Sequence, residues 1–262
     1  MRLSVSNIAW TAAQDPAVYS LMRDYGYSGL EIAPTRIFTE RPYDDLEAAH
    51  KWAIGLEREY GFCVSSMQSI WFGRKENLFG TEEERRSLLE YTKKAIDFAE
   101  AVGCNNLVFG CPKNRVLPDG LTDETAVDFF RTIGNYAVIH GTTVGMEANP
   151  PIYHTNYINS TAAALDLIRR VDSPGFQLNL DLGTMIQNGE TADLLVGNAG
   201  FVNHIHISEP GLRPIKKRRL HQEVMDVLDR EGYQKFISIE MGTTEDINEL
   251  KNIMAYVRDR VI

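Results

Sequence analysis

The most informative stretch of this sequence is Val202-Asn203-His204-Ile205-His206-Ile207-Ser208-Glu209. Polar and apolar residues alternate along it, so a strand would carry His204 and His206 on one face and the isoleucines on the other. In an ordinary half-exposed strand, that imidazole face would meet water. Three other strand-like segments end on a carboxylate: Val144-Gly145-Met146-Glu147, Leu178-Asn179-Leu180-Asp181 and Ile237-Ser238-Ile239-Glu240. Four side chains that can bind a metal ion, each at a strand end, predict one shared site.

The rest of the chain repeats one unit, an amphipathic helix followed by a glycine and an apolar strand. The glycines, such as Gly61 and Gly175, suit the left-handed position just past a helix. Helix starts are indicated at Asp15-Pro16, with Asp15 as the N-cap, and at the Thr81-x-x-Glu84 capping box. The predicted strands are Leu3–Ile8, Leu30–Ala33, Cys63–Ser69, Leu107–Phe109, Thr143–Ala148, Phe176–Asp181, Val202–Ser208 and Phe236–Met241.

Strands that alternate with helices predict parallel pairing, because a helical crossover is the short way to join parallel strands. Eight such units in 262 residues indicate an α/β protein with a single (β/α)8 TIM barrel rather than an open sheet. No linker or change in composition divides the chain. We therefore expect residues 1–262 to form one domain.

Composition limits the partners of this protein. A net charge of −9 argues against nucleic acid or an anionic membrane surface, which require a basic footprint. The start of the chain carries no signal-peptide pattern, and no apolar run of about 18 residues exists to span a bilayer. The three cysteines lack paired spacing, which suits free thiols in a reducing compartment. We expect a cytoplasmic protein with a small-molecule substrate; the sequence leaves its oligomeric state open, a homo-oligomer included.

Four residues are the candidate metal ligands: Glu147, Asp181, His206 and Glu240, separated by 34, 25 and 34 residues, or about one βα unit each. In a barrel, the C-terminal ends of the strands meet at the face where active sites form. Three carboxylates there would repel one another in a partly desolvated cavity, and a divalent cation removes that cost. This donor set suits Mn²⁺, our first choice, as well as Mg²⁺ or Co²⁺, with Zn²⁺ as a further candidate.

These four residues also carry a resemblance. Glu147 in GMEANP, Asp181 in NLDLG, His206 in HIHISEP and Glu240 in SIEM resemble the metal ligands of the xylose isomerase-like TIM-barrel superfamily. The most similar branch contains the sugar phosphate isomerases and epimerases, among them the ketose 3-epimerases. The resemblance covers essentially the whole chain. It implies one divalent metal ion and a small carbohydrate, or sugar phosphate, bound through adjacent oxygens.

Such a site suits proton abstraction next to a carbonyl. A metal ion across the carbonyl and the neighbouring hydroxyl oxygen stabilises the enediolate that forms when the proton leaves. By similarity, Glu147 and Glu240 are the catalytic pair, one on each side of the enediolate plane, and they act as base and acid. Asp181 and His206 are then ligands only. The expected activity is that of a metal-dependent sugar isomerase or epimerase.

The residues that would hold the sugar depart from the family pattern. Thr184 stands where the ketose epimerases usually carry a histidine, and Tyr153 stands near the position of a glutamate. The arginine expected after the histidine ligand corresponds to Arg213. We take Gln68, Tyr153 and Arg213 as candidate substrate-binding residues. Substrate identity does not carry over from the family.

Three other functions compete with this one. An inosose dehydratase-like lyase would use the same intermediate to expel a hydroxyl group, and product analysis would separate the two. A metal- or sugar-binding barrel without catalysis is the second alternative. A DNA-repair endonuclease of the same fold needs several more histidine and acidic ligands on the early strands, and the acidic chain lacks them.

Glu31, inside a predicted strand, is expected to join an internal ion pair.

Overall fold

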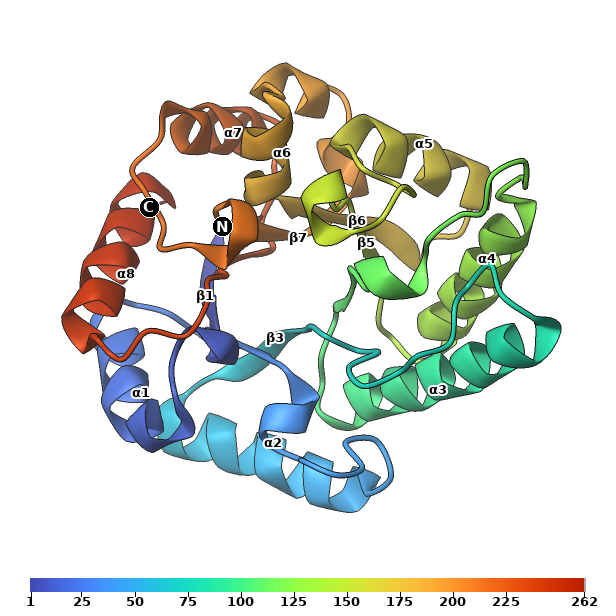
Figure 1. The fold of residues 1–262 in the computed structure, drawn as a ribbon. Helices are drawn as coiled ribbons and strands as arrows, with labels where there is room; N and C mark the ends of the chain where they lie inside the picture. Colours follow the sequence, from blue (N-terminus) through green and yellow to red (C-terminus); the bar gives the residue numbers. More distant parts are fainter. Residues whose placement is uncertain (262) are drawn as a thin grey trace.

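Eight parallel strands close into a barrel in the order β1 to β8 (Figure 1). The structure is a computed structural model that describes residues 1–261. Strand β1 pairs with β2 on one side and with β8 on the other, which closes the sheet. The strands are β1 (Arg2–Ser6), β2 (Gly29–Ile32), β3 (Cys63–Met67), β4 (Leu107–Phe109), β5 (Val144–Glu147), β6 (Phe176–Asp181), β7 (Val202–Ile207) and β8 (Phe236–Ile239). All eight predicted strands are confirmed, with ends displaced by at most two residues.

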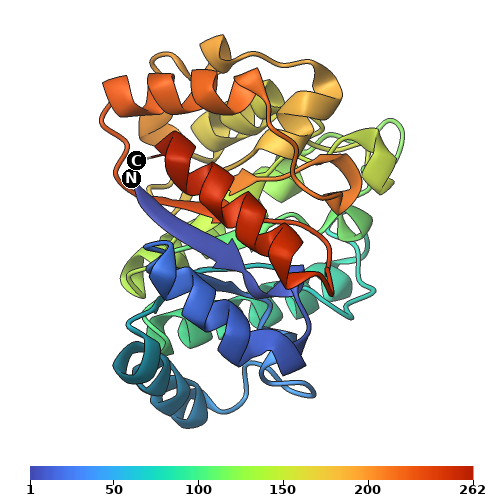
Figure 2. The same ribbon diagram turned by 90° about the vertical axis from the view of Figure 1, so that its left-hand side faces the viewer.

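The helices form a ring around the barrel (Figure 1), and the side view shows α1 and α8 lying over β1 (Figure 2). They are α1 (Asp15–Asp24), α2 (Leu46–Tyr60), α3 (Glu82–Ala101), α4 (Glu124–Ile139), α5 (Thr161–Val171), α6 (Leu182–Asn188), α7 (Arg219–Arg230) and α8 (Ile247–Val261). Together these elements confirm the (β/α)8 TIM barrel. Within residues 1–261, no helix combines the length and the apolar character that a bilayer crossing requires.

Local signals predicted the helix ends with mixed success. Thr81 caps α3 through the expected box, since its side chain accepts from Glu84 N and its own N–H donates to the Glu84 carboxylate. The prediction for Asp15 was wrong, because Asp15 is the first residue of α1 rather than its cap. Its carboxylate instead accepts hydrogen bonds from Trp10 Nε1 and Arg36 Nη2, both at 2.7 Å. The Asp15 carboxylate oxygen that could cap the helix accepts these side-chain hydrogen bonds instead.

Gly175 also differs from its expected role. Helix α5 ends at Val171, and its C-cap residue, Asp172, adopts the left-handed conformation with φ at 50°. At Gly175 the reason for glycine is space, because a Cβ there would lie 2.0 Å from the carbonyl oxygen of Gly134 in α4. The small residue therefore allows α4 to pack closely against the entry to β6.

The interior of the barrel is unusually polar below the strand ends. TIM barrels mostly fill this space with layers of branched apolar side chains. Here Ser4 Oγ lies 2.5 Å from Ser65 Oγ and 3.5 Å from Ser238 Oγ. Asn106 donates to the side-chain oxygen of Asn179 at 3.3 Å. The three serines contact one another and the two asparagines share a hydrogen bond, and this polar interior leads up to the candidate site.

Candidate metal centre

The four predicted ligands converge at the C-terminal mouth of the barrel. Glu147 and Asp181 are the last residues of β5 and β6, His206 lies next to the end of β7, and Glu240 follows β8. The register pairs Asp181 with His206 across β6 and β7, which sets them at one level. One donor atom from each of the four residues lies within 4.8 Å of the other three.

Glu147 is held by several polar contacts. His206 Nδ1 lies 2.9 Å from its Oε1, and Asn179 Nδ2 donates to the same oxygen at 3.0 Å. Asn149 Nδ2 donates to Oε2 at 3.1 Å. Gly110 leaves room for this carboxylate, because a Cβ at that position would lie 2.8 Å from Oε2. The orientation of the Glu147 side chain is therefore fixed by its surroundings.

Asp181 is both a strand end and a helix cap. Its Oδ1 accepts from Thr184 N at 2.6 Å, which caps α6, and its Oδ2 accepts from the Ser208 hydroxyl. Thr184 occupies the position of the family's substrate-holding histidine, but its own hydroxyl donates to Ala148 O at 2.7 Å. The Thr184 hydroxyl is therefore engaged in a hydrogen bond to the local backbone.

Crowding of the carboxylates changes their proton affinity. Burial, together with the charge of Glu147, raises the pKa of Asp181 to about 6. Burial raises the pKa of Glu240 to about 7, despite the favourable contact of its Oε2 with His206 Nδ1 at 3.2 Å. Desolvation and like charges both penalise an ionised carboxyl group. Three carboxylates and one imidazole of this kind fit a divalent cation, whose charge would offset that penalty.

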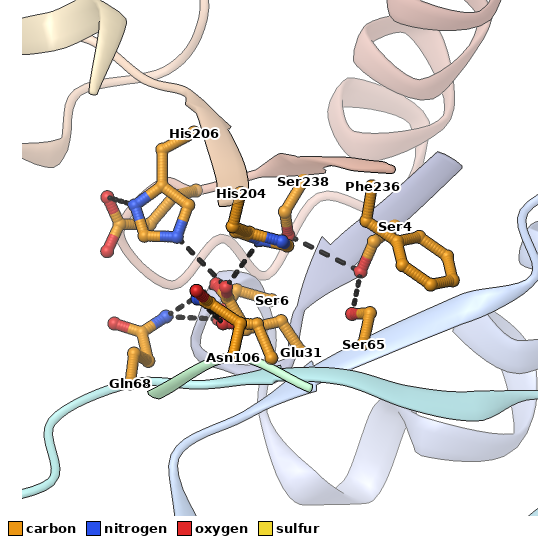
Figure 3. Close-up of polar contacts among 12 residues, drawn as sticks. Ser4, Ser6, Glu31, Ser65, Gln68, Asn106, His204, His206, Phe236 and Ser238 are labelled. Carbon is orange, nitrogen blue, oxygen red and sulfur yellow. Dashed lines mark hydrogen bonds and ion pairs between the residues drawn. The ribbon is translucent and has the colours of Figure 1, made fainter. Parts of the chain in front are cut away.

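The second nitrogen of His206 is also engaged. His206 Nε2 lies 2.9 Å from Glu31 Oε2, and His204 Nε2 lies 3.0 Å from the same oxygen (Figure 3). Burial alone would raise the pKa of Glu31, but the two imidazoles outweigh it and lower that pKa. The expectation that Glu31 joins an internal ion pair is confirmed.

A cavity of about 170 Å³ lies beside the four ligands, with Glu147, Asp181 and Glu240 in its wall. Gln68 and Tyr153 also line it, whereas Arg213 does not. Arg213 is exposed, and its Nε donates to Pro210 O at 2.9 Å within its own loop. Of the three candidate substrate-binding residues, the structure thus brings two to the cavity.

Those two residues are already partly engaged. Gln68 Nε2 donates to Ser6 Oγ and, at 3.2 Å, to Glu31 Oε1. The Tyr153 hydroxyl accepts from Gly211 N at 2.8 Å. Burial and the negative charges of Asp181, Glu240 and Glu147 raise the pKa of Tyr153 to about 12, so its hydroxyl keeps its proton at neutral pH.

Sequence reasoning missed the residues that hold Glu147. Asn179 lies two residues before Asp181 on β6 and so faces the same side, a signal that was available in the period of two. Arg115 offered no such signal because it lies on a loop. It is fully buried, donates from Nη2 to Glu147 O at 2.9 Å and to Asn149 Oδ1 at 2.7 Å, and burial lowers its pKa to about 10.

Comparison with known protein families gives one match over most of the chain. The model of a family described as xylose isomerase-like TIM barrel matches residues 19–259. No curated protein matches the chain.

Several solved structures are similar to this one over nearly the whole chain. D-psicose 3-epimerase from Clostridium cellulolyticum H10, solved with D-tagatose, has a TM-score of 0.80 at 14% identity, covering 100% of this chain and 99% of that one. The 3-keto-D-glucoside 4-epimerase YcjR from E. coli has a TM-score of 0.78 at 18% identity, covering 99% of each chain. IOLI protein with a bound zinc atom has a TM-score of 0.73 at 14% identity, covering 100% of this chain and 98% of that one. At these identities the likeness establishes a shared fold.

Proposed function

Because the chain belongs to the xylose isomerase-like TIM-barrel family, we propose that it is a carbohydrate isomerase or epimerase that depends on one divalent metal ion. The observation that carries this proposal is the convergence of Glu147, Asp181, His206 and Glu240 within 4.8 Å beside a cavity. The epimerases among the similar structures act on sugars, which supports a sugar as the substrate class. The cavity of about 170 Å³ suits a small substrate rather than a polymer.

The same four residues would hold the ion. Their three carboxylates and one imidazole suit Mn²⁺ first, and Mg²⁺, Co²⁺ or Zn²⁺ can use the same donors. When bound, the ion supplies a Lewis acid that favours negative charge on the oxygen atoms next to the reacting carbon. The zinc atom in the similar IOLI structure supports a divalent metal as the cofactor class.

Glu147 and Glu240 would carry the proton to and from the reacting carbon. Asn149 and Asn179 both donate to Glu147, which orients its carboxylate for the role of a base. In the described part of the chain no amide donates to the Glu240 carboxylate, and its pKa of about 7 suits an acid near neutral pH. In the reverse reaction the two residues exchange roles. A proton taken from one face and returned to the other inverts the carbon.

The test is isotope exchange. The protein is incubated in D₂O with Mn²⁺ or Mg²⁺ and a panel of ketoses, aldoses and inososes. We expect deuterium at one carbon of a substrate, together with an isomer of otherwise unchanged mass, and loss of both when a chelator removes the ion. A product that has lost water would instead identify a lyase. Absence of exchange with the whole panel would contradict the proposal and favour a binding protein.

A further inference from the structure

The buried carboxylate of Glu31, on β2, contacts one of the four candidate ligands, His206, from across the barrel. Glu31 on β2 reaches His206 and His204 on β7, and all three side chains are at most 1% exposed (Figure 3). One oxygen, Oε2, lies 2.9 Å from His206 Nε2 in hydrogen-bond geometry. The same oxygen lies 3.0 Å from His204 Nε2, where the angle falls outside that geometry. His206 is therefore the histidine that Glu31 holds directly.

The position of Glu31 is itself fixed by the first strands. Its other oxygen, Oε1, accepts from Gln68 Nε2 at 3.2 Å, and Gln68 also donates to Ser6 Oγ. Contacts from two sides leave the carboxylate little freedom to rotate. In Figure 3, Gln68, Ser6 and Glu31 lie together on the side of the barrel that faces the two histidines.

The chemistry of imidazole links this contact to ion binding. A neutral imidazole carries one N–H, and the hydrogen bond made by one nitrogen decides which nitrogen keeps a free lone pair. Nε2 of His206 faces Glu31, while Nδ1 faces Glu147 at 2.9 Å and Glu240 at 3.2 Å. We infer that Glu31 is a positioning residue, which keeps the hydrogen on Nε2 and presents the lone pair of Nδ1 to a metal ion. The inference rests on the proposed function.

A second interpretation of the same residues is a metal site of their own. One donor atom each from Glu31, His204 and His206 also lies within 4.8 Å of the other two. None of these three residues lines the cavity beside the four ligands. The direct hydrogen bond from His206 to Glu31 occupies the nitrogen and the oxygen that an ion would need. The contacts therefore favour positioning, and ion stoichiometry separates the two interpretations.

The first experiment measures binding of Mn²⁺ and Zn²⁺ to the metal-free protein by calorimetry. We expect one ion per chain in the wild type. Glu31→Leu removes the acceptor, so its ion affinity should fall by about 10- to 100-fold. Glu31→Gln keeps an oxygen that can accept from Nε2 but loses the negative charge, so its loss should be smaller. The matched control is Ser4→Ala, which alters the buried polar interior through Ser65 and Ser238 without contacting Glu31 or His206; its ion affinity should equal that of the wild type.

The second experiment uses the metal-free protein and needs no activity. In ¹⁵N-resolved NMR spectra, His206 Nε2–H should appear as a slowly exchanging, hydrogen-bonded proton in the wild type and in Ser4→Ala. This signal should be lost in Glu31→Leu. Glu31→Gln preserves the shape of the side chain and an oxygen that can accept from Nε2, so it should keep the signal and serves as the control for folding.

The inference is overturned if both Glu31 variants bind the ion as tightly as the wild type, or if the wild type binds two ions and Glu31→Leu binds one. It is also overturned if the Nε2–H signal persists in Glu31→Leu. A wild type that shows this signal but binds no ion would contradict the proposed function alone, because the contact between Glu31 and His206 would still be present.

Discussion

Glu147 and Glu240 face the same nitrogen of His206 from different surroundings. Glu147 accepts from two asparagine amides, and its Oε1 also lies 2.9 Å from His206 Nδ1. Within residues 1–261, the Glu240 carboxylate contacts His206 Nδ1 at 3.2 Å and no amide donor, and burial raises its pKa to about 7. Two carboxyl groups held in different environments are a common basis for dividing acid and base roles.

Replacement of either residue by glutamine should separate proton exchange from inversion. Glutamine keeps an oxygen but cannot accept the substrate proton. Glu147→Gln and Glu240→Gln should each lower interconversion of the two isomers by about 10²- to 10⁴-fold, the usual contribution of a general acid or base. In D₂O each variant should still exchange the proton of one isomer, and the two variants should differ in which isomer that is. Deuterium content of both isomers, followed by mass spectrometry, provides the measurement.

The control for these variants is Glu190→Gln. Glu190 is a half-buried carboxylate that accepts from Thr161 N at 3.1 Å and lies outside the cavity. The Glu190→Gln variant should exchange substrate protons with D₂O at the wild-type rate. Interconversion at the wild-type rate in Glu147→Gln or Glu240→Gln would contradict the assigned roles.

Among the elements, α3 has the most complete start signal in its sequence. The Thr81 hydroxyl accepts from Glu84 N at 3.2 Å, and Glu84 Oε2 accepts from Thr81 N at 2.7 Å. Thr81→Ala should reduce the free energy of unfolding by about 1 kcal/mol, within the range measured for lost N-caps. Chemical denaturation monitored by circular dichroism checks this value. Thr81→Ser keeps the hydroxyl, so an equal loss in that variant would show that the cap is not the cause.

Elements could be predicted from sequence wherever a regular pattern extends over several residues. The alternation in Val202–Ile207 and the spacing of Thr81 and Glu84 are such patterns, and both correspond to what the structure contains. Asp15 could not be assigned in this way, because its partner Arg36 is distant in sequence and competes for the same carboxylate. Tertiary contacts of this kind leave no local signal.

For the whole molecule, the acidic cluster links ion binding to pH. The pKa values of Asp181 and Glu240, about 6 and about 7, lie above those of ordinary carboxyl groups. Both groups therefore hold protons at pH 5.5, which an ion must displace, and both are ionised at pH 8. In the metal-free protein their protonation stabilises the fold at low pH, and this contribution is lost as pH rises through 6 to 7.

The rise in Tm on addition of Mn²⁺ should therefore be larger at pH 8 than at pH 5.5. An ion at 100 times its Kd adds about 2.7 kcal/mol of stability, or roughly 5 to 10 °C for a chain of this size. Thermal unfolding with and without the ion at both pH values measures the difference. The same experiment on Glu240→Gln removes one of the two groups and should flatten the dependence. An equal rise at both pH values in the wild type would contradict this account.

At this scale the closed barrel and the convergence of the four candidate ligands could be predicted, because each βα unit repeats one pattern and each candidate lies at or next to a strand end. Arg115 and the pairing of Glu31 with His206 could not. Both depend on which strands and loops face one another across the barrel, and no pattern within one unit records that. Arg213 illustrates the same gap, since its loop directs the side chain to solvent.

The contact between Glu31 and His206 joins residues that lie 175 positions apart in the chain. Long-range pairs of this kind cost loop-closure entropy before the contact can compensate for it, which slows their formation. The four candidate ligands lie at the ends of strands β5 to β8, whereas Glu31, which we infer to orient the imidazole, lies on β2. Full ion affinity should therefore require that β2 and β7 face each other across the barrel, so that uptake of the ion during refolding reports that this arrangement has formed.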